Sequence, residues 1–210
     1  MILSGVMYKK LIVFEGIDGS GKTYHLNQVS KYLSKKKIKF IKIREPGGSK
    51  NSEIIRKIIL NNKSSLKKKT DLLLYMAARN ENYENILKPN LKNKVILLDR
   101  FIDSTIAYQH YGFKLNKKII KILNKFIVGK LKPDFTFLHV VPEKYIKKNI
   151  SGAKNKYDKF NKNFYNKVQK GFLKILKKDR NKIIIDSSKT KKYNIDIIKG
   201  KINKILKIND

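Results

Sequence analysis

The chain has 210 residues, of which 41% are hydrophobic, which excludes a mainly disordered chain and fits one globular domain over residues 1–210. Fifty basic residues against 16 acidic ones give a formal net charge of +34, which opens the alternative of a nucleic-acid-binding protein. The absence of cysteine excludes disulfides, and no uncharged run approaches the ~18 residues of a membrane span, so we expect a cytoplasmic protein with no membrane partner.

Short β-branched runs alternate with longer helical stretches along the chain. Continuous apolar runs of this kind are typical of strands that are covered on both faces. The predicted strands are residues 11–14, 38–43, 95–98, 135–141 and 183–185, and the predicted helices are residues 25–34, 52–60, 71–87, 116–128, 160–176 and 193–208. This alternation predicts an α/β fold with a mainly parallel sheet and helices on both faces. Residues 147–162 lack periodicity and are predicted to form a mobile loop.

The first predicted strand is followed directly by Gly-Ile-Asp-Gly-Ser-Gly-Lys-Thr and then by a predicted helix. This segment fits the pattern G-x-x-x-x-G-K-[ST] in the strand–loop–helix context that the pattern requires. Glycines let the backbone approach phosphate oxygens, and successive N–H groups with the helix N-terminus attract them. The predicted ATP-binding loop consists of Gly16, Ile17, Asp18, Gly19, Ser20, Gly21, Lys22 and Thr23. We expect Lys22 to bridge the outer phosphates and the Thr23 hydroxyl to bind Mg²⁺.

A phosphate loop of this kind needs a carboxylate for Mg²⁺ at the end of a neighbouring strand. Asp99 ends the third predicted strand, whose other residues are apolar. The carboxyl ends of parallel strands meet at one edge of a sheet, so Asp99 is expected to lie near Thr23. We therefore predict that Thr23 and Asp99 hold the metal ion.

Size and missing motifs separate the classes of phosphate-loop protein. A helicase or motor needs a longer chain, and a GTPase needs an N-K-x-D motif, which is absent. A small-molecule kinase remains. Only five of the 50 basic residues are arginines, which indicates that a retained arginine serves for its planar guanidinium. Arg44, Arg79 and Arg100 lie beside predicted strand ends or motifs, whereas Arg56 and Arg180 do not.

Four segments follow one another in the order and spacing of bacterial thymidylate kinases: residues 16–23, Arg-Glu-Pro-Gly-Gly-Ser at 44–49, Ala-Ala-Arg at 77–79, and Asp-Arg-Phe-Ile-Asp-Ser-Thr-Ile-Ala-Tyr-Gln at 99–109. The chain resembles that family over roughly residues 9–186, and the last segment is the most specific. The resemblance implies transfer of the γ-phosphoryl group of ATP, with Mg²⁺, to dTMP, giving dTDP. It also implies a three-layer α/β/α fold with a five-stranded parallel sheet, a short lid at residues 147–162, and a homodimer.

The resemblance further implies a role for individual residues. Arg100 would bind the dTMP phosphate, Tyr75 would stack on thymine, and Arg79 would donate to a thymine carbonyl. The residues implied to bind the substrate are Asp18, Glu45, Pro46, Tyr75, Arg79, Arg100, Thr105 and Gln109. The implied catalytic residues are Lys22, Asp99, Arg100 and, in the lid, Lys156.

The lid departs from the family pattern. Some members of the family have an arginine in the phosphate loop, at the position of Ser20 here. Members without it usually carry arginines in the lid instead. This chain has no arginine between Arg100 and Arg180. We therefore hypothesise that Lys156, with Lys147, Lys148 or Lys154, replaces them. Lysine brings charge without the bidentate fork, which predicts a working but slower kinase.

Two alternatives stay open. One is a nucleoside monophosphate kinase with a shifted base preference, for dUMP or dGMP. The other is a basic nucleic-acid-binding protein that uses the phosphate loop as a switch. The lysines are spread over the whole chain, so we interpret the charge as the codon bias of an A/T-rich genome, with no nucleic acid as the primary partner. The histidines have no metal-ligand spacing, and His25 is predicted to lie on a helix surface.

Overall fold

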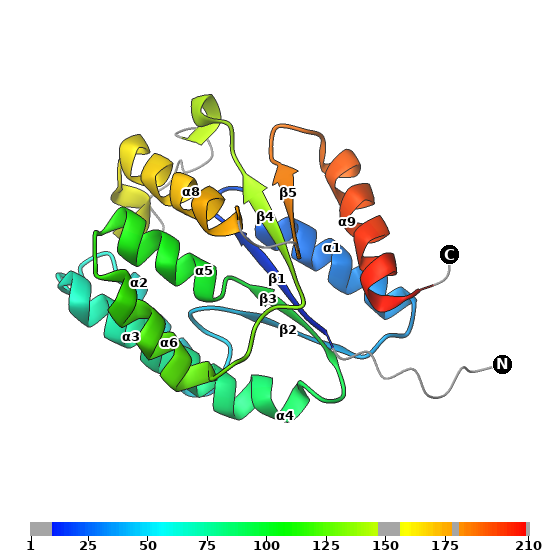
Figure 1. The fold of residues 1–210 in the computed structure, drawn as a ribbon, viewed down its shortest axis with the longest axis horizontal. Coiled ribbons are helices and arrows are strands. Elements are labelled where there is room, and N and C mark those ends of the chain that lie inside the picture. The colour runs from blue at the N-terminus through cyan, green and yellow to red at the C-terminus, as the bar shows by residue number, and fades with distance from the viewer. Residues whose placement is uncertain (1–9, 147–155, 178–180, 209–210) are drawn as a thin grey trace.

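Five strands form the centre of the protein in the computed structural model, which describes residues 10–146, 156–177 and 181–208 (Figure 1). They are β1 (Lys10–Gly16), β2 (Phe40–Arg44), β3 (Val95–Asp99), β4 (Phe135–Val140) and β5 (Lys182–Asp186). All neighbouring pairs are parallel, in the order β2-β3-β1-β4-β5. This confirms the predicted five-stranded parallel sheet. The order places the carboxyl end of β1 in the middle of the sheet edge, with β3 and β4 beside it.

The apolar run of β1 explains why helices cover both faces of the sheet. Ile12 and Phe14 pack on one face against α1 (Lys22–Lys35) and α9 (Lys191–Leu206). Leu11 and Val13 point to the other face, into a cluster that includes residues of β3 and of the helices beyond it. Each fully buried side chain of this size contributes about 1.5–3 kcal/mol. Because both faces of the sheet are covered, a polar side chain in this run could not reach water.

Six further helices lie within the described ranges. These are α2 (Lys50–Leu60), α3 (Lys68–Asn82), α4 (Lys88–Asn90), α5 (Ile102–Thr105), α6 (Lys117–Val128) and α8 (Lys162–Leu176). Figure 1 shows α1 and α9 together on one side of the sheet and α3, α4 and α6 on the other, which confirms the three-layer arrangement. Side-chain oxygens of Ser49, Asn116, Asn161 and Thr190 cap α2, α6, α8 and α9, which fixes where these helices begin. No helix within the described ranges is long and apolar enough to span a membrane.

Several predicted boundaries were wrong. The helix predicted to end before Pro89 continues through a π-helical turn, η1 (Tyr83–Leu87), into α4. In this turn the N–H of Lys88 bonds to the carbonyl of Tyr83, five residues back, so the hydrogen-bond ladder is already widened where the proline ring enters. Residues 102–112, which had no predicted element, form α5 and a second π-helical turn, η2 (Ile106–Gly112). Short 3₁₀ turns follow at η3 (Glu143–Tyr145) and η4 (Lys156–Lys159).

Candidate active site

The loop of residues 16–23 leaves β1 and enters α1 at the middle of the sheet edge. Gly16 has a φ of +140°, and a Cβ at this position would meet the main-chain oxygen of His139 on β4. The loop therefore lies against β4 as only glycine permits. At the start of α1 no side chain of the described residues caps the first N–H groups. These N–H groups and the positive end of the helix dipole suit the loop to phosphate.

Lys22 lies inside this loop with only 6% of its surface exposed. Its Nζ donates a hydrogen bond to the main-chain oxygen of Ile17 at 2.8 Å. Burial, and then the charge of Arg100, lower the pKa of Lys22 to about 8. The ammonium group thus keeps most of its charge at neutral pH, in the place where phosphates would lie.

The two predicted metal ligands lie side by side, although 76 residues separate them along the chain. The Oγ1 of Thr23 donates to Oδ2 of Asp99 at 2.7 Å. A hydroxyl and a carboxylate are oxygen donors of the kind that Mg²⁺ takes beside a nucleotide, where it keeps several waters and binds phosphate oxygens. Nowhere in the described part of the chain do three or more His, Cys, Asp or Glu side chains form a metal cluster. The pair therefore fits an ion that is shared with a nucleotide.

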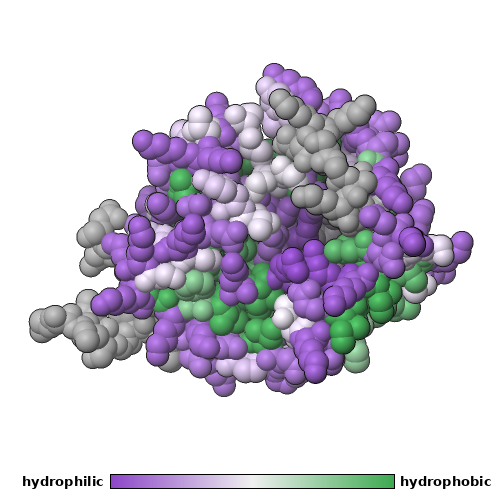
Figure 2. Space-filling model, turned by 180° about the vertical axis from the view of Figure 1, so that it is seen from behind, coloured by the Kyte–Doolittle hydropathy of each residue, from purple (hydrophilic) through white to green (hydrophobic). Residues whose placement is uncertain are grey.

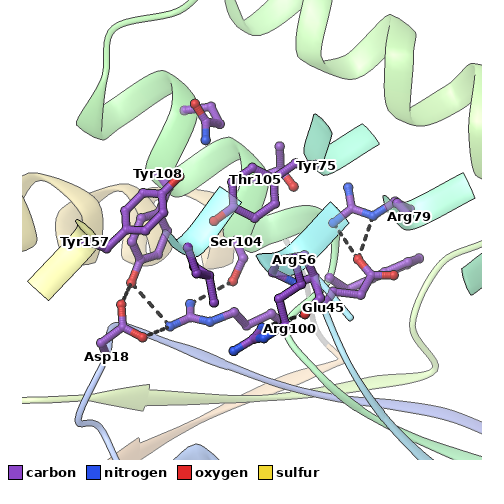
Figure 3. Close-up of a pocket in the computed structure, with 14 residues that line it drawn as sticks. Asp18, Glu45, Arg56, Tyr75, Arg79, Arg100, Ser104, Thr105, Tyr108 and Tyr157 are labelled. Atoms are coloured by element: carbon purple, nitrogen blue, oxygen red, sulfur yellow. Dashed lines mark hydrogen bonds and ion pairs between the residues drawn. The ribbon is translucent and has the colours of Figure 1, made fainter. Parts of the chain in front are cut away.

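A cleft opens beside the loop (Figure 3). All eight residues that the resemblance assigned to the substrate line this cleft: Asp18, Glu45, Pro46, Tyr75, Arg79, Arg100, Thr105 and Gln109. Six further lining residues were not assigned from the sequence: Arg56, Leu60, Phe101, Ser104, Tyr108 and Tyr157. Figure 3 shows charged side chains along one side of the cleft and tyrosine rings along the other.

A second hollow adjoins the cleft on the side of the phosphate loop. It is lined by Lys22, Thr23 and Asp99, among others. The cleft and this hollow share four lining residues, which are Asp18, Glu45, Arg56 and Arg100. A group bound in the cleft would therefore face the predicted phosphate and metal groups across these side chains.

Arg100 stands at the junction of the two spaces. Its Nη2 donates to Oδ1 of Asp18 at 2.6 Å, and its Nη1 donates to the main-chain oxygen of Gly16 at 2.9 Å. The hydroxyl of Tyr108 donates to the other carboxylate oxygen of Asp18 at 2.8 Å. Burial alone would raise the pKa of Asp18, but the charges of Arg100 and Lys22 hold it below its usual value. Asp18 is thus an ionised carboxylate that holds the guanidinium of Arg100 between the phosphate loop and the cleft (Figure 3).

The far end of the cleft holds a buried ion pair. Arg79 donates from Nε and Nη2 to Oε2 of Glu45, at 2.8 and 2.7 Å, and from Nη1 to the amide oxygen of Asn124 on α6. The exposed fractions of Arg79 and Glu45 are 3% and 5%. Burial raises the pKa of Glu45, although the charge of Arg79 opposes this. Nearby, the Oε1 of Gln109 is buried and has no hydrogen-bond partner among the residues that the structure describes.

Two tyrosines of the cleft lining contact each other. The hydroxyl of Tyr157, in η4, donates to Oδ2 of Asp71 at 3.1 Å, and its ring meets the ring of Tyr75 edge-on at 6.3 Å between centroids. Tyr157 belongs to the predicted lid, and only 4% of it is exposed. This contact is not predictable from a local pattern, because Asp71 and Tyr157 lie 86 residues apart in the chain.

The retained-arginine argument identified two of the three arginines of the cleft. Arg56 lies outside the predicted set, yet it lines the cleft and donates to the main-chain oxygen of Pro46 at 2.5 Å. Arg44, which was included, lines the second hollow instead and pairs with Glu53 near the surface. The surface prediction for His25 was wrong: the ring is buried and shares a hydrogen bond of 2.9 Å with His139. Lys147, Lys148 and Lys154 lie outside the described residues, as does the side chain of Lys156.

Comparison with known proteins gives one consistent family. The sequence pattern of the family described as thymidylate kinase matches residues 14–197. A thymidylate kinase of Fervidobacterium nodosum is 37% identical over 181 residues, which span 85% of this chain and 91% of that protein. One from Prochlorococcus marinus strain NATL2A is 38% identical over 212 residues, spanning 96% and 99%. The crystal structure of thymidylate kinase from Ehrlichia chaffeensis has a TM-score of 0.74 at 33% identity, covering 94% of this chain and 98% of that one.

Proposed function

The chain belongs to the thymidylate kinase family, and from this premise we propose that it transfers the γ-phosphoryl group of ATP to dTMP and releases dTDP. The observation that carries the proposal is the junction of the two spaces. The hollow beside the phosphate loop and the cleft meet across Asp18 and Arg100. A phosphate held in the cleft by Arg100 would face the γ-phosphoryl group of ATP in the loop. Positioning and charge neutralisation of this kind account for most of the catalysis of phosphoryl transfer.

On the ATP side, the N–H groups of residues 16–23 would hold the phosphates and Lys22 would contact the outer ones. Thr23 and Asp99 would hold Mg²⁺ against the phosphate oxygens. When bound, Mg²⁺ neutralises charge on the transferring phosphoryl group. Asp18, whose pKa is held low by Arg100 and Lys22, stays ionised and keeps the Arg100 guanidinium turned toward both nucleotides.

On the dTMP side, the cleft supports recognition of a pyrimidine. Tyr75 offers a ring face of a size to stack on thymine. Arg79, fixed by Glu45, would donate to a thymine carbonyl, and the buried Oε1 of Gln109 would accept from the ring N–H. A buried acceptor without a partner costs about 1–3 kcal/mol, which a ligand donor at that point removes. Pro46 and Thr105 would complete the walls.

We also propose a homodimer, as the resemblance implies. The amphipathic helix α6 has three large apolar side chains on its outer face: Ile119, Ile122 and Phe126 are 53%, 65% and 85% exposed. Leu73 on the neighbouring α3 is 57% exposed. Isolated exposed residues need no explanation, but a group on adjacent helices suits an interface. Light scattering should give twice the chain mass, and Phe126→Asp should give the monomer; a monomeric wild-type protein would contradict this.

The positive charge does not favour the nucleic-acid alternative. The lysines are spread over the whole chain, and Figure 2 shows hydrophilic residues over much of one face with apolar groups in its lower half. A dedicated polyanion site would gather its cations along one element or groove. Because ATP and dTMP are the proposed substrates, we expect the protein to act in the cytoplasm.

The test is a panel of nucleoside monophosphates with Mg²⁺ and ATP, with ADP release as the signal. We expect the highest kcat/KM for dTMP. Equal or faster turnover of dUMP or dGMP would instead establish a kinase with a shifted base preference. ADP release that no monophosphate stimulates would contradict the proposal, and the nucleic-acid alternative would then be tested by salt-dependent oligonucleotide binding.

A further inference from the structure

Glu15 is a buried carboxylate directly before the phosphate loop, and the roles assigned so far do not use it. It lies on β1 with 1% of its surface exposed. One oxygen, Oε1, accepts hydrogen bonds from the main-chain N–H groups of Phe101 and Ser104, at 2.8 and 3.1 Å. The other oxygen accepts from the hydroxyl of Ser104. A buried charge is tolerated only with such partners, and here they are Phe101, the residue before α5, and Ser104 in the first turn of α5.

The segment that Glu15 holds includes Arg100. This residue has a φ of +71°, a left-handed conformation that costs an L-residue with a side chain of this kind about 1–3 kcal/mol. The strain persists only because neighbouring groups fix the segment. The N–H of Arg100 donates to the carbonyl of Phe14 at 3.0 Å, and the next N–H, that of Phe101, donates to Glu15. Residues 14 and 15 of β1 thus hold the backbone on both sides of the Arg100 Cα.

A second link runs through side chains. The hydroxyl of Ser104 donates to Glu15 and at the same time accepts from Nη1 of Arg100 at 3.2 Å. The same Nη1 donates to the main-chain oxygen of Gly16 at 2.9 Å. If Glu15 is protonated, its carboxyl group becomes a donor and the Ser104 hydroxyl loses its acceptor. The Ser104 hydroxyl hydrogen then has to turn away, and the Glu15 O–H competes with Nη1 of Arg100 for the lone pairs of the Ser104 oxygen, which weakens the contact with Arg100.

The charges around Glu15 decide when this happens. Asp103 on α5 and the cations Arg100 and Lys22 act on it, and Lys182 on β5 pairs with Asp103 at 2.7 Å. His139 on β4 lies beside the Glu15 backbone. Burial, and then the charge of Asp103, raise the pKa of Glu15 to about 7, against the lowering effects of Ser104, Arg100 and Phe101. The carboxylate is therefore expected to titrate within the working range of a cytoplasmic enzyme.

We propose that Glu15 is a positioning residue, whose ionised carboxylate holds the start of α5 and the Ser104 hydroxyl so that Arg100 keeps the strained conformation that binds the substrate phosphate. The inference rests on the proposed dTMP kinase function, since it assigns Arg100 that phosphate. Glu15 itself touches neither nucleotide. It acts through Ser104 and Phe101, and it links the order of the Arg100 segment to the strand that carries the phosphate loop.

The test compares Glu15→Gln, Ser104→Ala and the double variant with the wild type between pH 5.5 and 8.5. Glutamine keeps the size and one acceptor oxygen but has no ionised form. We expect Glu15→Gln to lower kcat/KM for dTMP about tenfold at pH 8 and much less at pH 6, with the KM for ATP almost unchanged. Taking the ratio of wild type to variant removes the titration of the dTMP phosphate itself, which lies near pH 6. Ser104→Ala should act alike, and the double variant should be no worse than either.

The proposal would be overturned if the ratio of kcat/KM for dTMP between wild type and Glu15→Gln were constant across this pH range. It would also be overturned if the KM for ATP changed as much as the KM for dTMP. A second measurement does not depend on activity. Hydrogen bonds to a carboxylate are stronger than those to an amide, so the N–H groups of Phe101 and Ser104 should exchange with solvent faster in Glu15→Gln at pH 8. Unchanged protection of both would contradict the positioning role. A wild-type protein that does not phosphorylate dTMP would reject the proposed function instead, and amide exchange would then decide the role of Glu15.

Discussion

The buried pair of Glu45 and Arg79 gives a prediction in which stability and activity separate. Glu45→Gln leaves the Arg79 guanidinium 3% exposed with only neutral acceptors, Asn124 and the new amide. Breaking a buried ion pair in this way costs about 3–5 kcal/mol, because the remaining charge is desolvated without compensation. For a chain of this length, that corresponds to a fall in melting temperature of roughly 6–20 °C. Urea unfolding with two independent probes measures the loss.

The reverse experiment replaces both partners by apolar residues, as Glu45→Leu with Arg79→Met. Exchanging a buried pair for packed apolar groups is often neutral or stabilising, although Asn124 here loses a partner at a cost of about 1–3 kcal/mol. We therefore expect the double variant to be more stable than Glu45→Gln. Its kcat/KM for dTMP should nevertheless fall about 10- to 150-fold, since one charged hydrogen bond of about 1.5–3 kcal/mol to the base is lost.

A matched control uses the exposed pair of Arg44 and Glu53, whose side chains are 55% and 37% exposed. Glu53→Gln should cost less than about 1 kcal/mol, because water screens the charge that remains. The reasoning is refuted if Glu45→Gln is as stable as this control. It is also refuted if the double variant retains the full activity of the wild type, since Arg79 would then not contact the base.

Three further predictions concern the phosphate, the lid and acid stability. Arg100→Lys keeps the charge but loses the planar fork that contacts Asp18 and, in the proposed function, the substrate phosphate. The kcat/KM for dTMP should therefore fall about 10- to 150-fold while the fold persists by circular dichroism, and wild-type kinetics would remove Arg100 from the site. Lys156→Ala should lower kcat about tenfold or more and Lys156→Arg should match or exceed the wild type in single-turnover kinetics, whereas an unchanged alanine variant would reject the lid hypothesis. Burial, and then the charge of His25, lower the pKa of His139 to about 3, so below pH 6.5 the unfolded chain binds a proton that the folded protein does not. The contribution of His139 to stability should be full above pH 6.5 and should fall toward pH 3 by up to about 1.4 kcal/mol per pH unit. If the melting temperature of His139→Leu falls as steeply with decreasing pH as that of the wild type, this prediction is contradicted.

The sheet and the phosphate loop were predictable because their signals are local. The apolar run of β1 and the eight residues that follow it carry their meaning within one strand, one loop and one helix turn. The pairing of Thr23 with Asp99 was also predictable, although it is distant in sequence. Asp99 is the last residue of β3, Thr23 follows β1 through the phosphate loop, and the parallel pairing of β1 with β3 brings these ends together.

What the sequence did not predict depends on contacts between elements. Tyr157 lies in a stretch without periodicity, and only its packing on α3 makes it part of the cleft. The π-helical turn η2 depends on hydrogen bonds between residues five apart, such as that from the N–H of Phe113 to the carbonyl of Tyr108, and apolar periodicity along the chain does not mark them. His25 was placed on the surface because helical spacing does not reveal a partner on β4, 114 residues away.

In the proposed function, the cleft beside the phosphate loop presents dTMP to ATP. The most direct measurement is a competition in one tube, with the purified protein, Mg²⁺–ATP and equal dTMP and dUMP, in which the two diphosphate products are separated and quantified. Because a pocket gains about 1–3 kcal/mol from one extra methyl group, we expect dTDP in an excess of about 10- to 200-fold over dUDP. Equal amounts of the two products, an excess of dUDP, or no diphosphate at all would contradict it.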